Sequence, residues 1–223
     1  MHKKFLLVAL ISGTAAAHPH IEGGPAFANV SGQLVTFGVS HGCSGKDTVK
    51  IEVAIPTGVT GVRGLYGPFG APKATKDANN NVTTVTWEKA TYETDDNTYP
   101  EFTLRLKVPD VPFTQLMFSV TQTCRDATGD TVVVWDKPDD TTGNAAPRLT
   151  VVPARAKGWN KFMLPAGIAE ADVPLYFGDA HIVWKGSAAY SPNAVVHAMI
   201  AMTPGVSVLS GDLAAGDEIW VKY

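Results

Sequence analysis

The stretch VKIEVAI, residues 49–55, decides the fold class, because apolar and polar side chains alternate along it. Its valines and isoleucines would share one face, while Lys50 and Glu52 would share the other. Pro56 ends the run and Gly58 turns the chain. A period of two is typical of a β-strand that packs one face on a core and exposes the other to water. The stretch therefore predicts a half-buried strand.

Other short apolar runs surround it, each bounded by turn residues. They predict further strands at residues 33–40, 82–87, 101–108, 116–123, 131–135 and 149–152. Residues 61–81 are rich in Gly, Pro, Lys and Asn and predict a long loop. About seven short strands without helical periodicity predict an antiparallel, Ig-like β-sandwich. We expect this mostly β domain to span residues 18–153.

The last part of the chain, residues 154–223, predicts a small α+β appendage. Short strands are expected at residues 159–164, 181–184 and 217–223. A helix is expected over residues 193–202, with Ser191 as N-cap and Pro192 in its first turn. The sequence assigns this appendage no role.

Residues 1–17 have the pattern of a secretory signal peptide. Lys3 and Lys4 form a positive start, residues 5–11 are apolar, and residues 15–17 are alanines that form a cleavage signature. We expect cleavage after Ala17 and export to the periplasm or the cell surface. The mature chain contains no stretch long and apolar enough to span a bilayer.

Charge and cysteine content narrow the class further. Loss of two lysines would move the formal net charge from −3 to about −5, and such a chain lacks the basic footprint that nucleic acid requires. Cys43 and Cys124 form an even pair, so an exported chain predicts a disulfide between them. We expect this disulfide to connect the two sheets of the sandwich. The alternative is that the two cysteines serve as a pair of thiolate copper ligands.

Cleavage after Ala17 would make His18 the first residue of the chain, followed by Pro19 and His20. A terminal histidine offers its α-amine and its imidazole as one chelate, here called a brace, and Cu(II) prefers such nitrogen donors. The amine loses its proton readily, since its pKa lies near 8. Pro19 has no amide proton to lose, which excludes the familiar three-residue amino-terminal copper motif. His20 would add its imidazole or nothing.

Several short motifs run in one order along residues 18–153, and together they resemble the YcnI-like family of exported copper-binding domains. They are His18 with Glu22, VSHGC (39–43), VKIEVAIPTGV (49–59), YPEF (99–102), VTQTC (120–124), Trp135, Ala146-Pro147 and LTVVP (149–153). Residues 64–70 depart from the family, which carries a Pro-Gly-Trp turn there. The appendage lies outside the resemblance.

The resemblance implies a Cu(II) site formed by a single-histidine brace at His18, helped by Glu101 and Trp135. It implies a non-enzymatic role in copper homeostasis, either sequestration or delivery to a membrane copper transporter or a copper chaperone. Two other functions stay open. A copper-dependent oxidative enzyme would need a second brace histidine, for which His41 is the only candidate. A metal-free adhesion or assembly module would need the sandwich alone.

Overall fold

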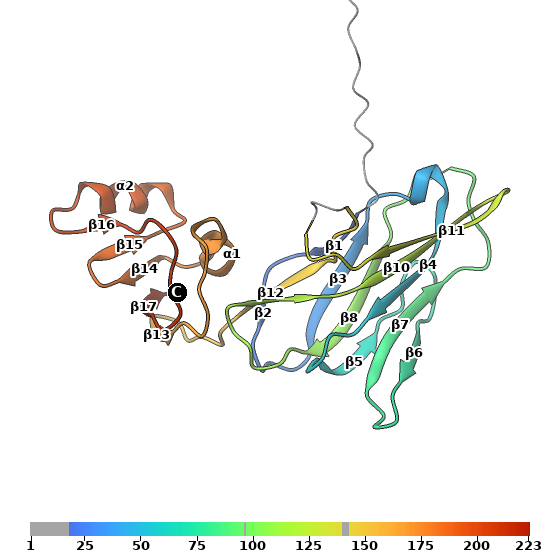
Figure 1. Ribbon diagram of the computed structural model, residues 1–223, viewed down its shortest axis with the longest axis horizontal. Helices are drawn as coiled ribbons and strands as arrows, with labels where there is room; N and C mark the ends of the chain where they lie inside the picture. Colours follow the sequence, from blue (N-terminus) through green and yellow to red (C-terminus); the bar gives the residue numbers. More distant parts are fainter. Residues whose placement is uncertain (1–17, 96, 140–142) are drawn as a thin grey trace, which may run out of the picture.

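The computed structural model describes residues 18–95, 97–139 and 143–223, and it confirms a mostly β molecule with an Ig-like sandwich (Figure 1). The predicted signal peptide lies outside the described residues. One sheet has four strands in the order β1 (Pro19–Glu22), β3 (Gln33–Val39), β8 (Glu101–Lys107) and β5 (Thr60–Gly64). The other has five, in the order β11 (Gly129–Trp135), β10 (Val120–Asp126), β4 (Asp47–Ala54), β7 (Val82–Glu88) and β6 (Lys73–Lys76). All neighbours within these two sheets pair antiparallel.

A third, three-stranded sheet closes one end of the sandwich. Its order is β2 (Ala26–Phe27), β12 (Arg148–Val152) and β9 (Thr114–Met117), and β2 pairs with β12 in parallel. The alternating residues meet between the layers as predicted, since Ile51 of β4, Leu104 of β8 and Trp87 of β7 are all fully buried in one apolar cluster. Burying such large apolar side chains contributes roughly 1.5–3 kcal/mol each.

Two predictions about the boundaries of strands and loops in the sandwich were wrong. Residues 61–81 are not one long loop, because they contain most of β5 and all of β6. All four side chains of β6 are exposed at the edge of its sheet, so this strand has no alternating apolar pattern to recognise. The predicted strand at residues 116–123 is two strands, β9 and β10, which are separated at the buried Phe118.

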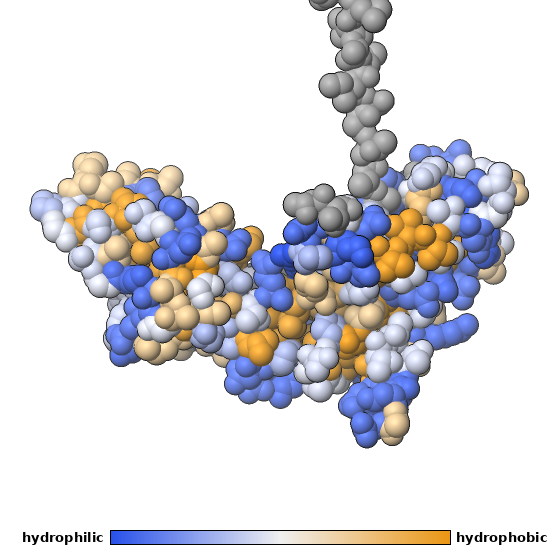
Figure 2. All heavy atoms as spheres, in the orientation of Figure 1, coloured by the Kyte–Doolittle hydropathy of each residue, from blue (hydrophilic) through white to orange (hydrophobic). Residues whose placement is uncertain are grey.

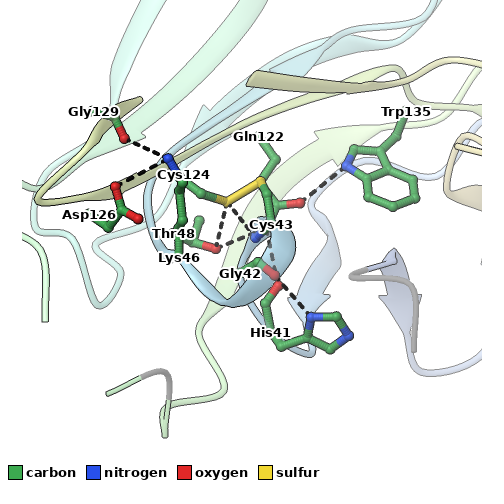
Figure 3. The surroundings of a disulfide bond; sticks show 10 residues. All are labelled: His41, Gly42, Cys43, Lys46, Thr48, Gln122, Cys124, Asp126, Gly129 and Trp135. Carbon is green, nitrogen blue, oxygen red and sulfur yellow. Dashed lines mark hydrogen bonds and ion pairs between the residues drawn. A yellow bond between two sulfur atoms is a disulfide. The ribbon is translucent and has the colours of Figure 1, made fainter. Parts of the chain in front are cut away.

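Cys43 and Cys124 form the predicted disulfide, with Cα atoms 5.6 Å apart (Figure 3). We expected the bond to cross between the two sheets, and that expectation was wrong. Cys43 begins the short 3-10 turn η1 (Cys43–Gly45) ahead of β4, and Cys124 pairs with Thr48 of β4 in the ladder. The bond therefore ties the β3–β4 connection to β10 within the five-stranded sheet.

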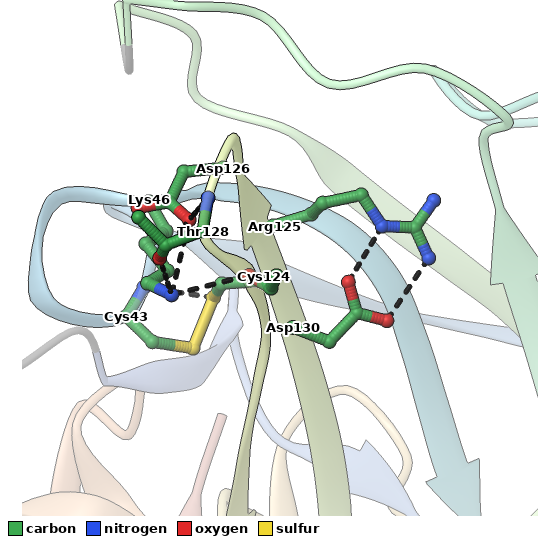
Figure 4. A network of polar contacts seen from close by, with 8 residues as sticks. Cys43, Lys46, Cys124, Arg125, Asp126, Thr128 and Asp130 are labelled. Carbon is green, nitrogen blue, oxygen red and sulfur yellow. Dashed lines mark hydrogen bonds and ion pairs between the residues drawn. A yellow bond between two sulfur atoms is a disulfide. The ribbon is translucent and has the colours of Figure 1, made fainter.

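Charged groups reinforce the same end of that sheet (Figure 4). Lys46 lies 3.1 Å from the carboxylate of Asp126 and donates to the Thr128 hydroxyl at 3.1 Å. Arg125 and Asp130 form a two-point pair across the β10–β11 hairpin, with distances of 2.6 and 3.0 Å. The disulfide region is thus held by polar contacts as well as by the covalent bond.

The remaining residues form a five-stranded sheet with two small helices. Its order is β13 (Trp159–Met163), β17 (Glu218–Lys222), β14 (Ile182–Lys185), β15 (Ala188–Tyr190) and β16 (Ser207–Val208). The helical segments are η3 (Glu170–Asp172), α1 (Val173–Phe177) and α2 (Ala194–Met202). A second apolar cluster lies beneath this sheet, and it includes Phe113 and Val152 from the end of the sandwich.

The N-cap of α2 differs from the prediction. The side chain of Asn193 accepts hydrogen bonds from the backbone N–H groups of Val195 and Val196, at 2.9 and 3.2 Å. Ser191 is buried, and its hydroxyl donates to the carbonyl of His181 instead. An N-cap must stand directly before the first helical turn, and Asn193 holds that position.

Candidate metal site

Strand β1 carries the first described residues into the edge of the four-stranded sheet. Its ladder aligns His20 with Gly38 of β3, and Gly38 in turn aligns with Glu101 of β8. Pro19 and Ile21 face inward, so His20 and Glu22 face the outer surface together with Glu101. The alternation of a strand thus gathers histidine and carboxylate side chains on one outer face.

The His18 ring lies against Trp135 at the end of β11. The two ring centroids are 4.9 Å apart and the planes are tilted by 56°. Trp135 belongs to the sandwich core, with 3% of its surface exposed. Two of the three predicted site residues are therefore in contact, although 117 positions separate them in the sequence.

Gln122 holds the Trp135 ring in place from behind, and the sequence did not reveal this role. It is fully buried, and its side-chain oxygen accepts a hydrogen bond from the Trp135 indole at 3.2 Å (Figure 3). Its amide nitrogen donates to the Thr48 hydroxyl at 2.9 Å and to the His41 carbonyl at 3.2 Å. A polar residue at an inward position of β10, between Val120 and Cys124, was the signal that could have identified it.

His41 itself lies just after β3. Its Nδ1 is 3.0 Å from the carbonyl oxygen of Gly42, and its Nε2 is buried without a hydrogen-bond partner in the described part of the chain. The hydrogen bond of its side chain is thus with the β3–β4 connection that the disulfide anchors.

Glu101, the third predicted residue, is exposed at the start of β8. Gly38 of β3 lies between Glu101 and His20 in the ladder, so no side chain fills the outer face between β1 and β8 at this position. A Cβ at Gly38 would lie 2.8 Å from the Glu22 carboxylate and would clash with the Tyr99 hydroxyl. The absence of a side chain at Gly38 therefore leaves room for the oxygen atoms of Tyr99 and Glu22 between the two strands.

Tyr99, Glu22 and His20 fill this room as a hydrogen-bonded cluster. The Tyr99 hydroxyl donates to the Glu22 carboxylate, and His20 Nε2 lies 2.8 Å from that carboxylate and 2.9 Å from the phenol oxygen. The hydrogen bond from Tyr99 lowers the pKa of Glu22. Desolvation raises the pKa of Tyr99 to about 12, and the hydrogen bond and charge of Glu22 and the charge of Glu101 add to the shift.

The other nitrogen of His20 is also engaged, since Nδ1 lies 3.1 Å from the His18 carbonyl oxygen. His20 thus links the backbone of His18 to Glu22, and both of its ring nitrogens have partners. Figure 2 shows hydrophilic side chains gathered where the described chain begins, next to an apolar patch over β10 and β11. Val132 and Val134 are exposed on β11.

The donor set limits what kind of metal ion could bind. Among residues 18–95, 97–139 and 143–223, no three His, Cys, Asp or Glu side chains converge closely enough to hold a metal. Both cysteines are in the disulfide, so they supply no thiolate. A metal at this position would therefore need a further donor, and an α-amine at His18 is the group that cleavage after Ala17 would supply.

The sheet order and the core define this chain as an Ig-like β-sandwich protein with a histidine at the edge of the sandwich. It belongs to the family described as "domain of unknown function (DUF1775)", which matches residues 20–151, more than half of the chain.

A solved structure supports the fold. The chain is similar to an uncharacterized protein from Nocardia farcinica whose crystal structure reveals an immunoglobulin-like fold, with 20% identity and a TM-score of 0.51. The match covers 61% of this chain and 99% of that protein. No curated protein matches the sequence. None of the helices in the described ranges has the length and apolar character needed to cross a membrane.

Proposed function

We propose that this protein is exported to the periplasm or the cell surface and binds Cu(II) at His18 after removal of residues 1–17. In this proposal the α-amine and imidazole of His18 form the brace, Glu101 supplies a carboxylate oxygen, and Trp135 covers one side. The protein sequesters copper or delivers it to a membrane copper transporter or copper chaperone. It acts as a carrier and not as an enzyme.

The contact between the His18 and Trp135 rings is the observation that carries the proposal. After the proposed cleavage His18 would be the end of the chain, where packing usually contributes little, yet its ring lies against a buried indole that a fully buried glutamine holds in place. Glu101 lies on the same outer face as His20, with only Gly38 between them in the ladder. It is therefore near the strand that directly follows His18.

The donor chemistry favours Cu(II) over softer or harder ions. An amine, an imidazole and a carboxylate suit Cu(II), whereas Cu(I) prefers sulfur ligands and Mg²⁺ or Ca²⁺ prefer oxygen alone. The disulfide removes both thiols from consideration. The oxidative-enzyme alternative needs a second histidine at the metal, and His41 is the candidate for it. Its Nδ1 lies 3.0 Å from the Gly42 carbonyl oxygen, whereas its Nε2 has no hydrogen-bond partner among the described residues.

Copper binding can be tested with two proteins that differ by one residue. The first is processed to begin at His18, and the second has one alanine ahead of His18. Isothermal titration should give one tight Cu(II) site in the first protein only, and electron spin resonance should show nitrogen ligation. Blocking the amine removes one arm of the chelate, so the extended protein should bind at least tenfold more weakly, which corresponds to about 1.4 kcal/mol.

Side-chain variants test the rest of the site. Glu101→Gln should weaken binding, whereas Glu88→Gln, an exposed carboxylate on β7, should leave it unchanged. Trp135→Phe should alter the spin-resonance spectrum if the indole covers the metal. Equal binding by the processed and extended proteins, or no binding by either, would reject the brace and favour a metal-free adhesion or assembly module.

A further inference from the structure

Three tryptophans share the outer face of the C-terminal sheet, far from the candidate metal site in the sequence. They are Trp159 of β13, Trp220 of β17 and Trp184 of β14. Trp184 is directly opposite Trp220, and Trp159 is opposite Lys222, two residues along the same strand. Trp184 and Trp220 are therefore direct cross-strand neighbours, and Trp159 lies diagonally from Trp220 on the third strand. Together with Gly186 they line an open groove of about 510 Å³.

The core does not account for these side chains. The opposite face of the same sheet is the buried one, where Val183, Ile219 and Val221 are completely covered. Trp159 is 52% exposed and Trp220 is 44% exposed. Large aromatic side chains that are left in solvent and grouped around a groove mark binding surfaces more often than isolated exposed residues do. One face of the sheet therefore packs in the core, and the other face is accessible to a partner.

Charged groups are interleaved with the indoles. Lys161 lies 2.8 Å from the Glu218 carboxylate and 5.6 Å from the centre of the Trp220 ring. The Trp220 indole N–H donates to Glu218 at 3.1 Å, so its orientation is defined. Lys222 lies between Trp159 and Ile182 in the ladder and forms no ion pair within the described residues. The face therefore carries one positive charge in excess.

The mixture of indoles and charged side chains on this face limits which kind of partner could bind there. A wholly apolar partner, such as an acyl chain or a leucine-rich helix, would bury Lys161 and Glu218 without replacing their water. A pyranose ring has apolar C–H faces that stack on an indole and polar groups at its rim. Neighbouring strands are about 4.8 Å apart, a spacing comparable to one sugar unit. An acidic sugar would also pair with Lys222.

We propose that the groove lined by Trp159, Trp184 and Trp220 binds an anionic polysaccharide, with sugar rings stacked on the indoles and carboxylates paired with Lys222. This inference is independent of copper binding. It gives the C-terminal sheet a role in attaching the protein to acidic glycan.

The direct test uses the whole processed chain and polygalacturonate as the probe, with binding followed by titration calorimetry and by tryptophan fluorescence. Trp159→Ala and Trp220→Ala should each weaken binding about five- to tenfold, as expected for loss of one stacking contact. Trp159→Phe keeps an aromatic face and should retain most of the affinity. Lys222→Gln should weaken binding and reduce its dependence on salt.

Matched controls lie on the sandwich. Tyr66→Ala removes an aromatic ring that is 84% exposed, and Lys73→Gln removes a charge from β6, so neither should change binding. Thermal melts of every variant separate loss of the site from loss of the fold. Any of four results would overturn the proposal. They are no binding of polygalacturonate, equal binding of neutral dextran, tighter binding of an oligoproline peptide, and unchanged affinity in both tryptophan-to-alanine variants.

Discussion

Replacing Gln122 with methionine should cost stability out of proportion to the size of the change. Methionine has nearly the same length and volume as glutamine, so the cavity contribution is small. What changes is hydrogen bonding. The Trp135 indole N–H loses its acceptor at 3.2 Å, and the Thr48 hydroxyl and the His41 carbonyl lose a donor. All three contacts involve a residue with no exposed surface.

The size of the effect follows from these partners. A buried donor left without an acceptor costs roughly 1–3 kcal/mol. The Thr48 hydroxyl keeps a second contact with the Cys124 sulfur at 3.8 Å, so its loss is smaller. We therefore expect Gln122→Met to lower the free energy of unfolding by about 2–4 kcal/mol. Urea denaturation followed by fluorescence and circular dichroism measures this difference.

The control is Gln115→Met, the same chemical change at a glutamine whose partner is the exposed side chain of Arg148. It should change stability by no more than about 0.5 kcal/mol. A loss below about 1 kcal/mol for Gln122→Met would refute the reasoning, because it would mean that the indole finds another acceptor. Near-ultraviolet circular dichroism should also show a reoriented Trp135 in the variant.

Three further predictions concern other parts of the molecule. Reducing the bond between Cys43 and Cys124, which are 81 positions apart, should cost roughly 4–5 kcal/mol in denaturation under reducing conditions, by the chain-entropy relation. An ultraviolet difference titration against Tyr99→Phe should reveal a phenol with a pKa of about 12, and Glu22→Gln should lower it. Because the folded-state pKa is the higher one, this contribution to stability is complete below pH of about 10 and is lost as the pH rises through about 12. Asn193→Ala should destabilise α2 by about 1 kcal/mol in thermal or urea unfolding, and an unchanged melt would contradict its role as N-cap.

The strands that could be predicted were those whose alternation reflects burial. Residues 49–55 and 101–108 match β4 and β8 closely, because one face of each strand packs in the core. Strand β6 could not be predicted, since all of its side chains are exposed and pairing with β7 alone makes it a strand. The residues of β6 do not indicate that the segment will pair with β7, because strand preference depends on neighbours in the sheet.

Some residues of the candidate site could be predicted from the sequence, and others could not. The resemblance supplied His18, Glu101 and Trp135, and the structure brings the first and the last into contact. The cluster of Tyr99 with His20 was not predicted, because these residues lie 79 positions apart and meet only through the ladder of three strands. Contacts of this kind depend on register, which a motif does not encode.

The short ladder between β1 and β3 has a practical consequence. Four residue pairs, from Pro19 with Val39 to Glu22 with Thr36, set the position of the strand, and none of them involves His18. Two molecules that begin one residue apart are therefore expected to share the same far-ultraviolet circular dichroism spectrum, the same elution volume and the same melting curve. A purified sample can pass every common check of homogeneity while only a fraction of it begins at His18. The copper titrations proposed above therefore require an intact-mass measurement on each preparation, which shows at which residue the chain begins.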